Sequence, residues 1–375
     1  MTFHGFAIAL STLVGTIVGA GIFALPYVTA QSGVLITLSY FVILGGAVLL
    51  LHLMFGEVCL RTSGRHRLVG YAGRYLGLAG KLPVVFSTLF GLVGALLAYT
   101  IIGGSFLSIF TGISPFWASI LFWAALSFFV IKGIQFISRA ELFMNIALLG
   151  IFVLILVAAL PHVDLSRFES FHASRLFVPF GVVLFALTGW SAIPEVADLF
   201  KRDAERRSLD NLLVWASIIT VSLYAVFSLV VVGVTGSATS QDALSSLSPI
   251  LGDGVARLGA AFGLIAVAAS FLVLGNYLKN SLRYDFKLSV PLALSLTLLL
   301  PLALFLFGLR EFIPVLSSVG IVLGAIEGSA IVVLFWRARK KGDRKPEYQL
   351  HLSPKVGYAL ILLLLLGAIG SLIYA

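Results

Sequence analysis

Two short stretches of the sequence place helix-breaking residues inside apolar surroundings. The first is GTIVGAGIFALP, residues 15–26, and the second is FALTGWSAIPEVADLF, residues 185–200. Glycine weakens a helix through its backbone entropy, and proline weakens it because it lacks an N–H group. A break inside a bilayer leaves main-chain N–H and C=O groups without partners, at a cost of several kcal/mol each. A ligand can satisfy them, because the N-terminus of a half-helix suits a carboxylate and free carbonyls suit an ammonium group or a cation.

The two stretches share one spacing. Gly21 precedes Pro26 by five residues, Gly189 precedes Pro194 by five residues, and the two pairs are 168 residues apart. Small residues four apart, such as the two earlier glycines of the first stretch, can instead serve close helix packing. That alternative does not explain the third glycine or the proline. Matched breaks in two halves of a chain indicate a ligand site near the bilayer midplane, and an amino acid zwitterion fits such a site.

The elements that must position these breaks are membrane-spanning helices. Hydrophobic residues make up 60% of the 375 residues and charged residues only 11%. Apolar runs long enough to cross a bilayer recur, and without alternation they indicate helices instead of barrel strands. We therefore expect an all-α polytopic membrane protein with eleven spans, near residues 5–29, 34–60, 83–111, 115–131, 138–160, 176–200, 211–235, 256–278, 288–308, 312–336 and 356–374.

The spans are organised as a repeat. A shift of 168 residues places spans one to five on spans six to ten, and an odd number of spans inverts the second half in the membrane. We expect one transmembrane domain, 1–375, with a first repeat at about 3–160, a second at about 171–336 and an extra helix at about 355–375. No Lys or Arg precedes the first apolar run, so we interpret it as a span and not as a signal peptide.

The basic residues predict the orientation. With a cytoplasmic N-terminus, 21 of the 25 Lys and Arg residues fall in inner loops, as the positive-inside rule requires. This distribution also explains the net charge of +9 without a nucleic-acid partner. We expect a multi-pass protein of the plasma membrane with an extracellular C-terminus. The basic inner loops 61–81 and 337–355 are predicted to lie against anionic lipid headgroups.

Three stretches carry a resemblance to a known family. GTIVGAGIFALPYVTAQSG at 15–33, AYTIIGGSFL at 98–107 and AASFLVLGNYLKNSL at 268–282 resemble the hydroxy/aromatic amino acid permeases of the amino acid–polyamine–organocation superfamily. The resemblance extends over most of the chain, since the span number and the repeat also fit. It implies the leucine-transporter fold, with spans one and six broken. It also implies that a neutral, aromatic or hydroxylated L-amino acid enters the cell with a cation by alternating access.

The resemblance implies a set of substrate-binding residues. Those expected around the substrate carboxylate are Thr16, Gly19, Ala20 and Gly21. The main chain near Phe185, Ala186 and Thr188 would receive the amino group. Trp190 beside the second break could close over the substrate, or simply pack against a neighbouring span. Phe23 and Tyr99 are expected in the pocket wall, with an ordinary hydrogen-bonded core position as the alternative for the tyrosine.

The coupling ion is expected to be H⁺ or Na⁺, with no other cofactor. The positions that match the sodium site of relatives are Gly15, Val18, Ala269 and Ser270, and the alanine removes one oxygen ligand. This favours the proton, which needs an ionisable group at membrane depth. Glu195, directly after Pro194, is one candidate, although an acid at that position also caps a half-helix. Glu327 in GAIEGSAI is the other, with hydrogen bonding to a neighbouring helix as its alternative.

Other features favour structural interpretations. Glu57 is expected to pair with Arg61 one helical turn later. The loop 235–249 is predicted to be a solvated connector, with an outer lid as the alternative. The six histidines show no metal-binding spacing, and neither HExxH nor GxSxG occurs, which argues against an enzyme. A sensor or channel built on the same fold remains the main alternative to a transporter.

Overall fold

The computed structural model describes residues 3–64, 66–132, 150, 152–168, 171–200, 208–284 and 286–374, and over these ranges every regular element is a helix. The N-terminal elements are α1 (Phe3–Ile17), α2 (Gly21–Ser32), α3 (Val34–Leu60), α4 (Leu68–Thr111) and α5 (Pro115–Lys132). The later elements are α7 (Val178–Leu187), α8 (Ile193–Leu199), α10 (Leu209–Thr235), α11 (Ser248–Leu251), α12 (Asp253–Tyr284), α13 (Val290–Leu306), α14 (Phe312–Val322), α15 (Ser329–Lys341) and α16 (Pro354–Tyr374).

The all-helical membrane architecture is confirmed. Within the described ranges, eight helices are long and apolar enough to cross a bilayer, or nine when the bent pair around α1 and α2 is taken as one span. Two shorter apolar helices, Phe152–His162 and α13, lie where two further spans are expected. The first part of the expected span 138–160 lies outside the described residues. The number eleven stays a prediction.

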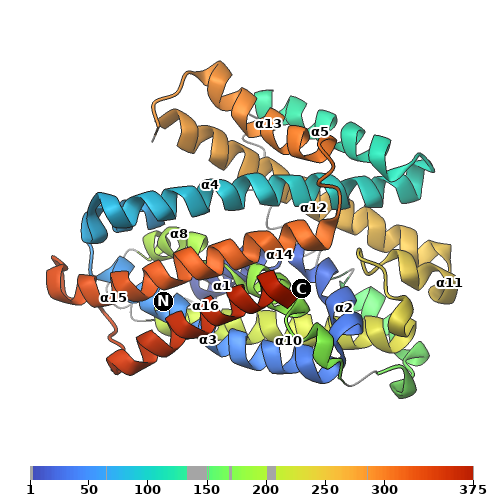
Figure 1. Ribbon diagram of the computed structural model, residues 1–375, viewed down its shortest axis with the longest axis horizontal. Helices are drawn as coiled ribbons and strands as arrows, with labels where there is room; N and C mark the ends of the chain where they lie inside the picture. The colour runs from blue at the N-terminus through green and yellow to red at the C-terminus, as the bar shows by residue number, and fades with distance from the viewer. Residues whose placement is uncertain are drawn as a thin grey trace.

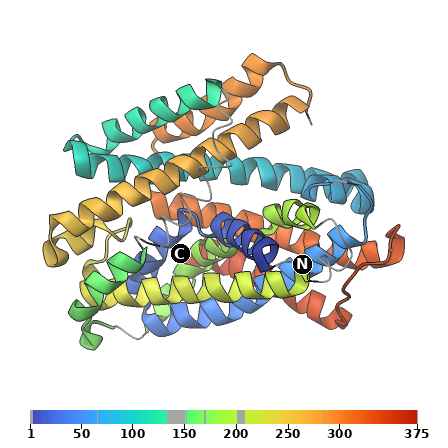
Figure 2. The ribbon, with the colours of Figure 1, turned by 180° about the vertical axis from the view of Figure 1, so that it is seen from behind.

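The helices form two groups that meet along α4 (Figure 1). The scaffold group, α4, α5, α12 and α13, is packed together on one side of the molecule. The broken-helix group contains α1, α2, α3, α7, α8 and α10, and Figure 2 shows α3 and α10 side by side on the opposite side. α14 contacts both α4 and α7, so it connects the two groups.

The first break lies where it was predicted. Residues Ala9–Ile17 and α2 are bent by 49°. At the bend the N–H of Gly19 donates to the carbonyl of Ile17 at 2.9 Å, and the N–H of Ile22 donates to that of Gly19 at 3.3 Å. In a continuous helix these N–H groups would bond the carbonyls four residues earlier. The break therefore takes the usual donors away from those carbonyls.

The second break is also present. α7 ends at Leu187, and Thr188 and Gly189 separate it from a short turn of 3₁₀ helix, Trp190–Ala192, that leads into α8. The N–H and the hydroxyl of Thr188 both donate to the carbonyl of Phe185, at 3.2 and 2.7 Å. Proline at position 194 suits the first turn of α8, where no helical N–H partner is needed.

The glycines at the two breaks allow the broken helices to touch. A Cβ on Gly21 would lie 2.9 Å from the Cα of Ala186, in α7. A Cβ on Gly189 would collide with the side chain of Ile17, in α1. Each glycine thus packs against the other helix just before its break. This reciprocal contact is what an inverted repeat predicts for equivalent positions.

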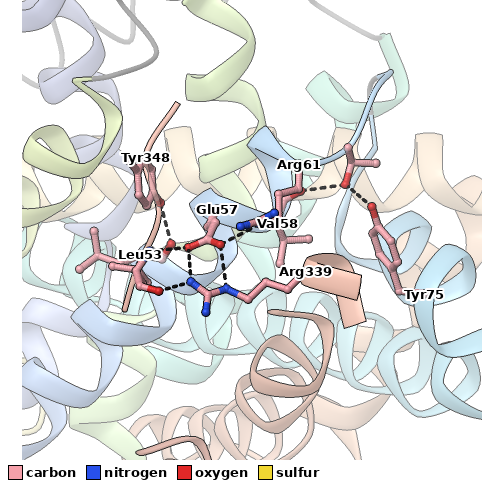
Figure 3. A network of polar contacts seen from close by, with 9 residues as sticks. Leu53, Glu57, Val58, Arg61, Tyr75, Arg339 and Tyr348 are labelled. Atoms are coloured by element: carbon pink, nitrogen blue, oxygen red, sulfur yellow. Dashed lines mark hydrogen bonds and ion pairs between the residues drawn. The ribbon is translucent and has the colours of Figure 1, made fainter. Parts of the chain in front are cut away.

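One end of the bundle is fixed by a buried carboxylate, shown in Figure 3. Glu57 is fully buried and accepts hydrogen bonds from Arg61 at 2.7 Å and Arg339 at 3.0 Å, which confirms the expected pair with Arg61. The N–H of Leu350 donates to the same carboxylate at 2.7 Å. The hydroxyl of Tyr348 donates to the carbonyl of Leu53 at 2.6 Å. The loop after α15 is therefore tied to α3 by specific bonds.

The same end carries a second tie. Asp343 accepts from the N–H of Ser63 and from Arg74, both at 2.9 Å. These contacts, the backbone hydrogen bond first, hold the pKa of the Asp343 carboxyl below its ordinary value. Arg74 and Arg339 thus serve contacts within the protein, whereas lipid binding by the inner loops stays a prediction.

The loop 235–249 is more ordered than a solvated connector. Asp242 accepts from the hydroxyl of Ser240 at 2.5 Å and from the N–H of Ser245 at 3.1 Å. Ala243 and Leu244 are buried to 1% exposure or less. The sequence suggested solvation because Ser and Thr dominate the loop, but these side chains satisfy their own turn and let its apolar residues point inward.

Candidate functional site

A single tyrosine links the two breaks. Tyr224, in α10, is fully buried, and its hydroxyl lies 2.9 Å from the carbonyl oxygens of both Ile17 and Ala186. Ile17 is the last residue of α1, and Ala186 is the last but one residue of α7, so both carbonyls lie at a break. The Tyr224 hydroxyl has one hydrogen and cannot donate it fully to two carbonyl oxygens. The two carbonyls can therefore still accept a hydrogen bond from a ligand. The role of Tyr224 could not be predicted from the sequence, because an isolated tyrosine in an apolar helix carries no local signal.

The positions proposed for sodium are only partly assembled. Gly15 and Val18 lose their usual helical donors, since the N–H groups of Gly19 and Ile22 bond elsewhere. Ser270, in α12, interacts with the side chain of Tyr99 of α4.

The residues expected around the carboxylate occupy different environments. Ala20 is buried, Gly21 packs against α7, and a Cβ on Gly19 would lie 3.7 Å from the Tyr99 hydroxyl. Thr16 is exposed, and its hydroxyl bonds the carbonyl of Thr12 in its own helix at 2.8 Å. The structure thus groups three of the four at the break and directs the Thr16 hydroxyl away from it.

An apolar cavity adjoins the first break. Its wall includes Gly19, Phe23, Phe152, Phe227, Leu244 and Phe262, and every residue that lines it is apolar. Phe23 stands edge-on to Phe106, with ring centroids 5.0 Å apart. Phe23 lies in the wall of this cavity, whereas Tyr99 lies near Gly19 and is not part of the lining. The outer loop contributes Leu244 to the wall.

Trp190 and Glu327 are in direct contact. The indole N–H of Trp190 donates to one carboxylate oxygen of Glu327 at 2.6 Å, and the hydroxyl of Thr88 donates to the other at 2.7 Å. Glu327 is 4% exposed, and no basic side chain pairs with it in the part of the chain that the structure describes. It lies in a π-helical segment, Leu323–Gly328, between α14 and α15, and such segments are frequent at functional sites.

Glu195 lies in a different setting. Its side chain is 61% exposed and pairs with Arg67 at 2.9 Å. The guanidinium of Arg67 also stacks over the ring of Tyr277, 4.5 Å from its centroid. Arg67 precedes α4 and Tyr277 belongs to α12, so this contact ties α8 to the scaffold group.

Helix dipoles give the site its polarity. α2 begins at Gly21 and α8 at Ile193, and their N-terminal ends carry partial positive charge at the breaks. α1 ends at Ile17 and α7 at Leu187, which places two partial negative ends at the same level. The arrangement offers positive and negative poles close together, as a zwitterion requires. Among the described residues, no cluster of His, Cys, Asp or Glu could hold a metal ion.

Nearly the whole sequence matches one known protein family. The family model described as the tryptophan/tyrosine permease family matches residues 3–373. The chain belongs to the tryptophan/tyrosine permease family. The resemblance found in the sequence is thereby confirmed, and the permease is a multi-pass membrane transporter instead of an enzyme.

Among curated relatives, the permease is 25% identical to glutamine transporter 2 of Aliivibrio fischeri (strain ATCC 700601 / ES114), an alignment that covers 98% of each chain. Among solved structures it resembles MhsT in complex with L-phenylalanine, with a TM-score of 0.67, 15% identity and coverage of 100% of this chain and 99% of the other. The inward-facing conformation of Mhp1 gives a TM-score of 0.65 at 16% identity, covering 98% and 88%. The permease has the leucine-transporter fold.

Proposed function

We propose that the permease is a secondary active transporter that carries a neutral, aromatic or hydroxylated L-amino acid into the cell together with a proton. The observation that carries the proposal is the contact of the two breaks, where opposite helix ends meet beside a cavity. The amino acid carboxylate would bind at the N-terminus of α2, near Gly19, Ala20 and Gly21. Its ammonium group would bind the carbonyls before the second break, near Phe185 and Ala186.

The substrate class follows from the apolar cavity. The cavity must widen to admit a substrate side chain, and an aromatic ring would then bury most of its surface among side chains such as Phe23, Phe152 and Phe262, at about 25 cal/mol per Å² of apolar area. A glutamine side chain would lose hydrogen bonds to water there, because the lining offers no polar side chain. We therefore favour an aromatic substrate over glutamine, the substrate named for the 25% identical relative.

The coupling ion follows from the ionisable groups at depth. Glu327 is buried and contacts Trp190, so a change in its protonation would change the hold on the indole beside the second break. The case for sodium at Gly15, Val18 and Ser270 is weakened because Ala269 lacks the oxygen ligand that the matching position of relatives supplies. We therefore favour the proton over sodium.

Glu195 serves the transport cycle at the surface in this proposal. Its bond to Arg67 holds α8 against the scaffold group at the predicted cytoplasmic end. The contact would break when that end opens. An exposed ion pair contributes only about 0–1 kcal/mol, which suits a contact that must open in each cycle.

Transport into proteoliposomes tests the function. We expect labelled phenylalanine or tryptophan to accumulate when the outside is acidic, and accumulation to persist when choline replaces sodium at constant pH. Glutamine, serine and threonine complete the panel. Accumulation that collapses without sodium would refute the proton assignment.

Counterflow separates a transporter from a sensor or channel. Vesicles loaded with unlabelled phenylalanine should take up labelled phenylalanine without any ion gradient, because alternating access permits exchange. A sensor would show no counterflow, and that result would refute the proposal.

A further inference from the structure

A second, polar cavity lies between α3 and α10 and reaches both breaks. Its lining includes Ile17 and Leu187, the last residues of α1 and α7, together with His52, Ser217 and Thr220. His52 is 1% exposed, Ser217 9% and Thr220 0%. Neither ring nitrogen of His52 and neither hydroxyl has a hydrogen-bond partner among the residues that the structure describes.

Four buried polar atoms without partners at one cavity are costly. Each such group costs roughly 1–3 kcal/mol when it is removed from water without a hydrogen bond. One polar ligand can relieve several of these costs, and the cavity has room for about one water molecule. The lining contains no carboxylate, so it suits a neutral or protonated ligand with both donor and acceptor capacity.

The ends of two half-helices make this position favourable for positive charge. A protonated imidazole in a buried site needs compensating negative charge. The C-terminal ends of α1 and α7 provide partial negative charge beside the cavity, through Ile17 and Leu187. The stabilisation of a positive charge on His52 therefore depends on the positions of α1 and α7.

We propose that His52 binds the co-transported proton in this cavity, with a water molecule shared between its ring, Ser217 and Thr220. The inference rests on the proposed proton symport and adds the residue that takes up the proton. Tilting of α1 or α7 during alternating access would move the helix ends away from the ring and release the proton. Histidine suits this role because its ordinary pKa lies near physiological pH.

The other ionisable groups around His52 are already engaged. Glu327 bonds Trp190, whose ring lies 6.3 Å from the His52 ring between centroids. Tyr224 of α10 bonds the carbonyl of Ile17, and Glu57, further along α3, bonds Arg61 and Arg339. The carboxylate of Asp198, in α8, lies close enough to Cys59, near the C-terminal end of α3, to interact with it electrostatically.

Neither α7 nor the last turn of α1 contains an ionisable residue. The side chain of Trp190 packs against the His52 ring and donates to Glu327, so it contacts two of the buried ionisable groups.

The test compares two transport modes in proteoliposomes with His52→Gln, Thr220→Val and the exposed control His351→Gln. Accumulation driven by a pH gradient moves protons, whereas counterflow at equal pH needs no net proton movement. We expect His52→Gln to lower accumulation by about tenfold or more and to keep counterflow within about threefold. Thr220→Val, which removes one hydroxyl at nearly constant volume, should shift the pH midpoint of accumulation. His351→Gln should match the wild type.

The outcomes distinguish this inference from the proposed function. Absence of counterflow in the wild-type permease would refute the transporter itself. Normal proton-driven accumulation in His52→Gln, or an equal loss of both modes, would overturn the proton role of His52. An unchanged pH midpoint in Thr220→Val would overturn the shared water molecule, because the hydroxyl would then not contact the protonated group.

Discussion

The two cavities at the breaks differ in chemistry although both adjoin the end of α1. The cavity at Gly19 and Phe23 is lined only by apolar residues, whereas the cavity at Ile17 and Leu187 contains His52 and two hydroxyls. One faces aromatic rings and the other faces helix C-termini. The difference indicates a division of labour at the breaks, with the substrate side chain on the apolar side and the proton on the polar side.

The largest expected effect comes from closing the space between the breaks. Gly21→Leu should reduce uptake by more than about 100-fold, because its side chain must enter the space occupied by Ala186 and push α2 away from α7. Gly46→Leu is the matched control, since a Cβ at Gly46 meets no atom within 4 Å. Uptake is measured after both variants are shown to reach the membrane in equal amounts. Normal uptake by Gly21→Leu would remove the substrate site from this contact.

The second largest effect is expected at Glu327, the carboxylate that accepts a hydrogen bond from Trp190. Glu327→Gln should reduce proton-driven accumulation by about tenfold or more, because an amide offers only one oxygen to Thr88 and Trp190 and so loosens the indole that packs against His52. Glu311→Gln, at an exposed position, is the control. The pH profile of uptake is the measurement, and a profile unchanged in Glu327→Gln would assign this carboxylate a purely structural role.

A smaller effect is expected from the link between the breaks. Tyr224→Phe removes the hydroxyl that bonds Ile17 and Ala186, at a cost of about 1–2 kcal/mol or roughly tenfold in rate. The hydroxyl joins the two breaks, so phenylalanine transport and its pH dependence should weaken together. Tyr358→Phe, at an exposed tyrosine, should leave both unchanged. Equal kinetics for Tyr224→Phe and wild type would show that the link is dispensable.

The smallest effect on transport is expected at a residue that lines neither cavity. Glu57→Gln removes a buried charge that holds Arg61 and Arg339, so the free energy of unfolding should fall by about 3 kcal/mol. Transport per folded molecule should change little. Thermal unfolding and uptake are measured on the same preparations, and a large loss of coupling would show that this end of the molecule takes part in the cycle.

The sequence predicted what is set locally. The breaks follow from glycine and proline in apolar helices, and the pair of Glu57 with Arg61 follows from one helical turn. Glu327 was identified because a carboxylate inside an apolar span is unusual. Its partner Trp190 lies 137 residues away, and that contact could not be inferred from spacing.

The sequence could not predict contacts that only the packed bundle creates. Tyr224 lies 207 residues from Ile17 along the chain. His52 lies in an apolar helix whose sequence gives no sign of the cavity that it lines. Glu195 was expected at membrane depth because it follows a break. The structure exposes it and pairs it with Arg67, since the short helix α8 directs that position outward.

The affinity of the purified permease for phenylalanine as a function of pH tests the division between the cavities most directly. If substrate and proton bind cooperatively, the dissociation constant must rise with pH, approaching about tenfold per pH unit above the titration of the proton site. We expect this slope in the wild type and a flat profile in His52→Gln. A dissociation constant independent of pH in the wild-type permease between about pH 5 and 9 would contradict proton coupling at the breaks.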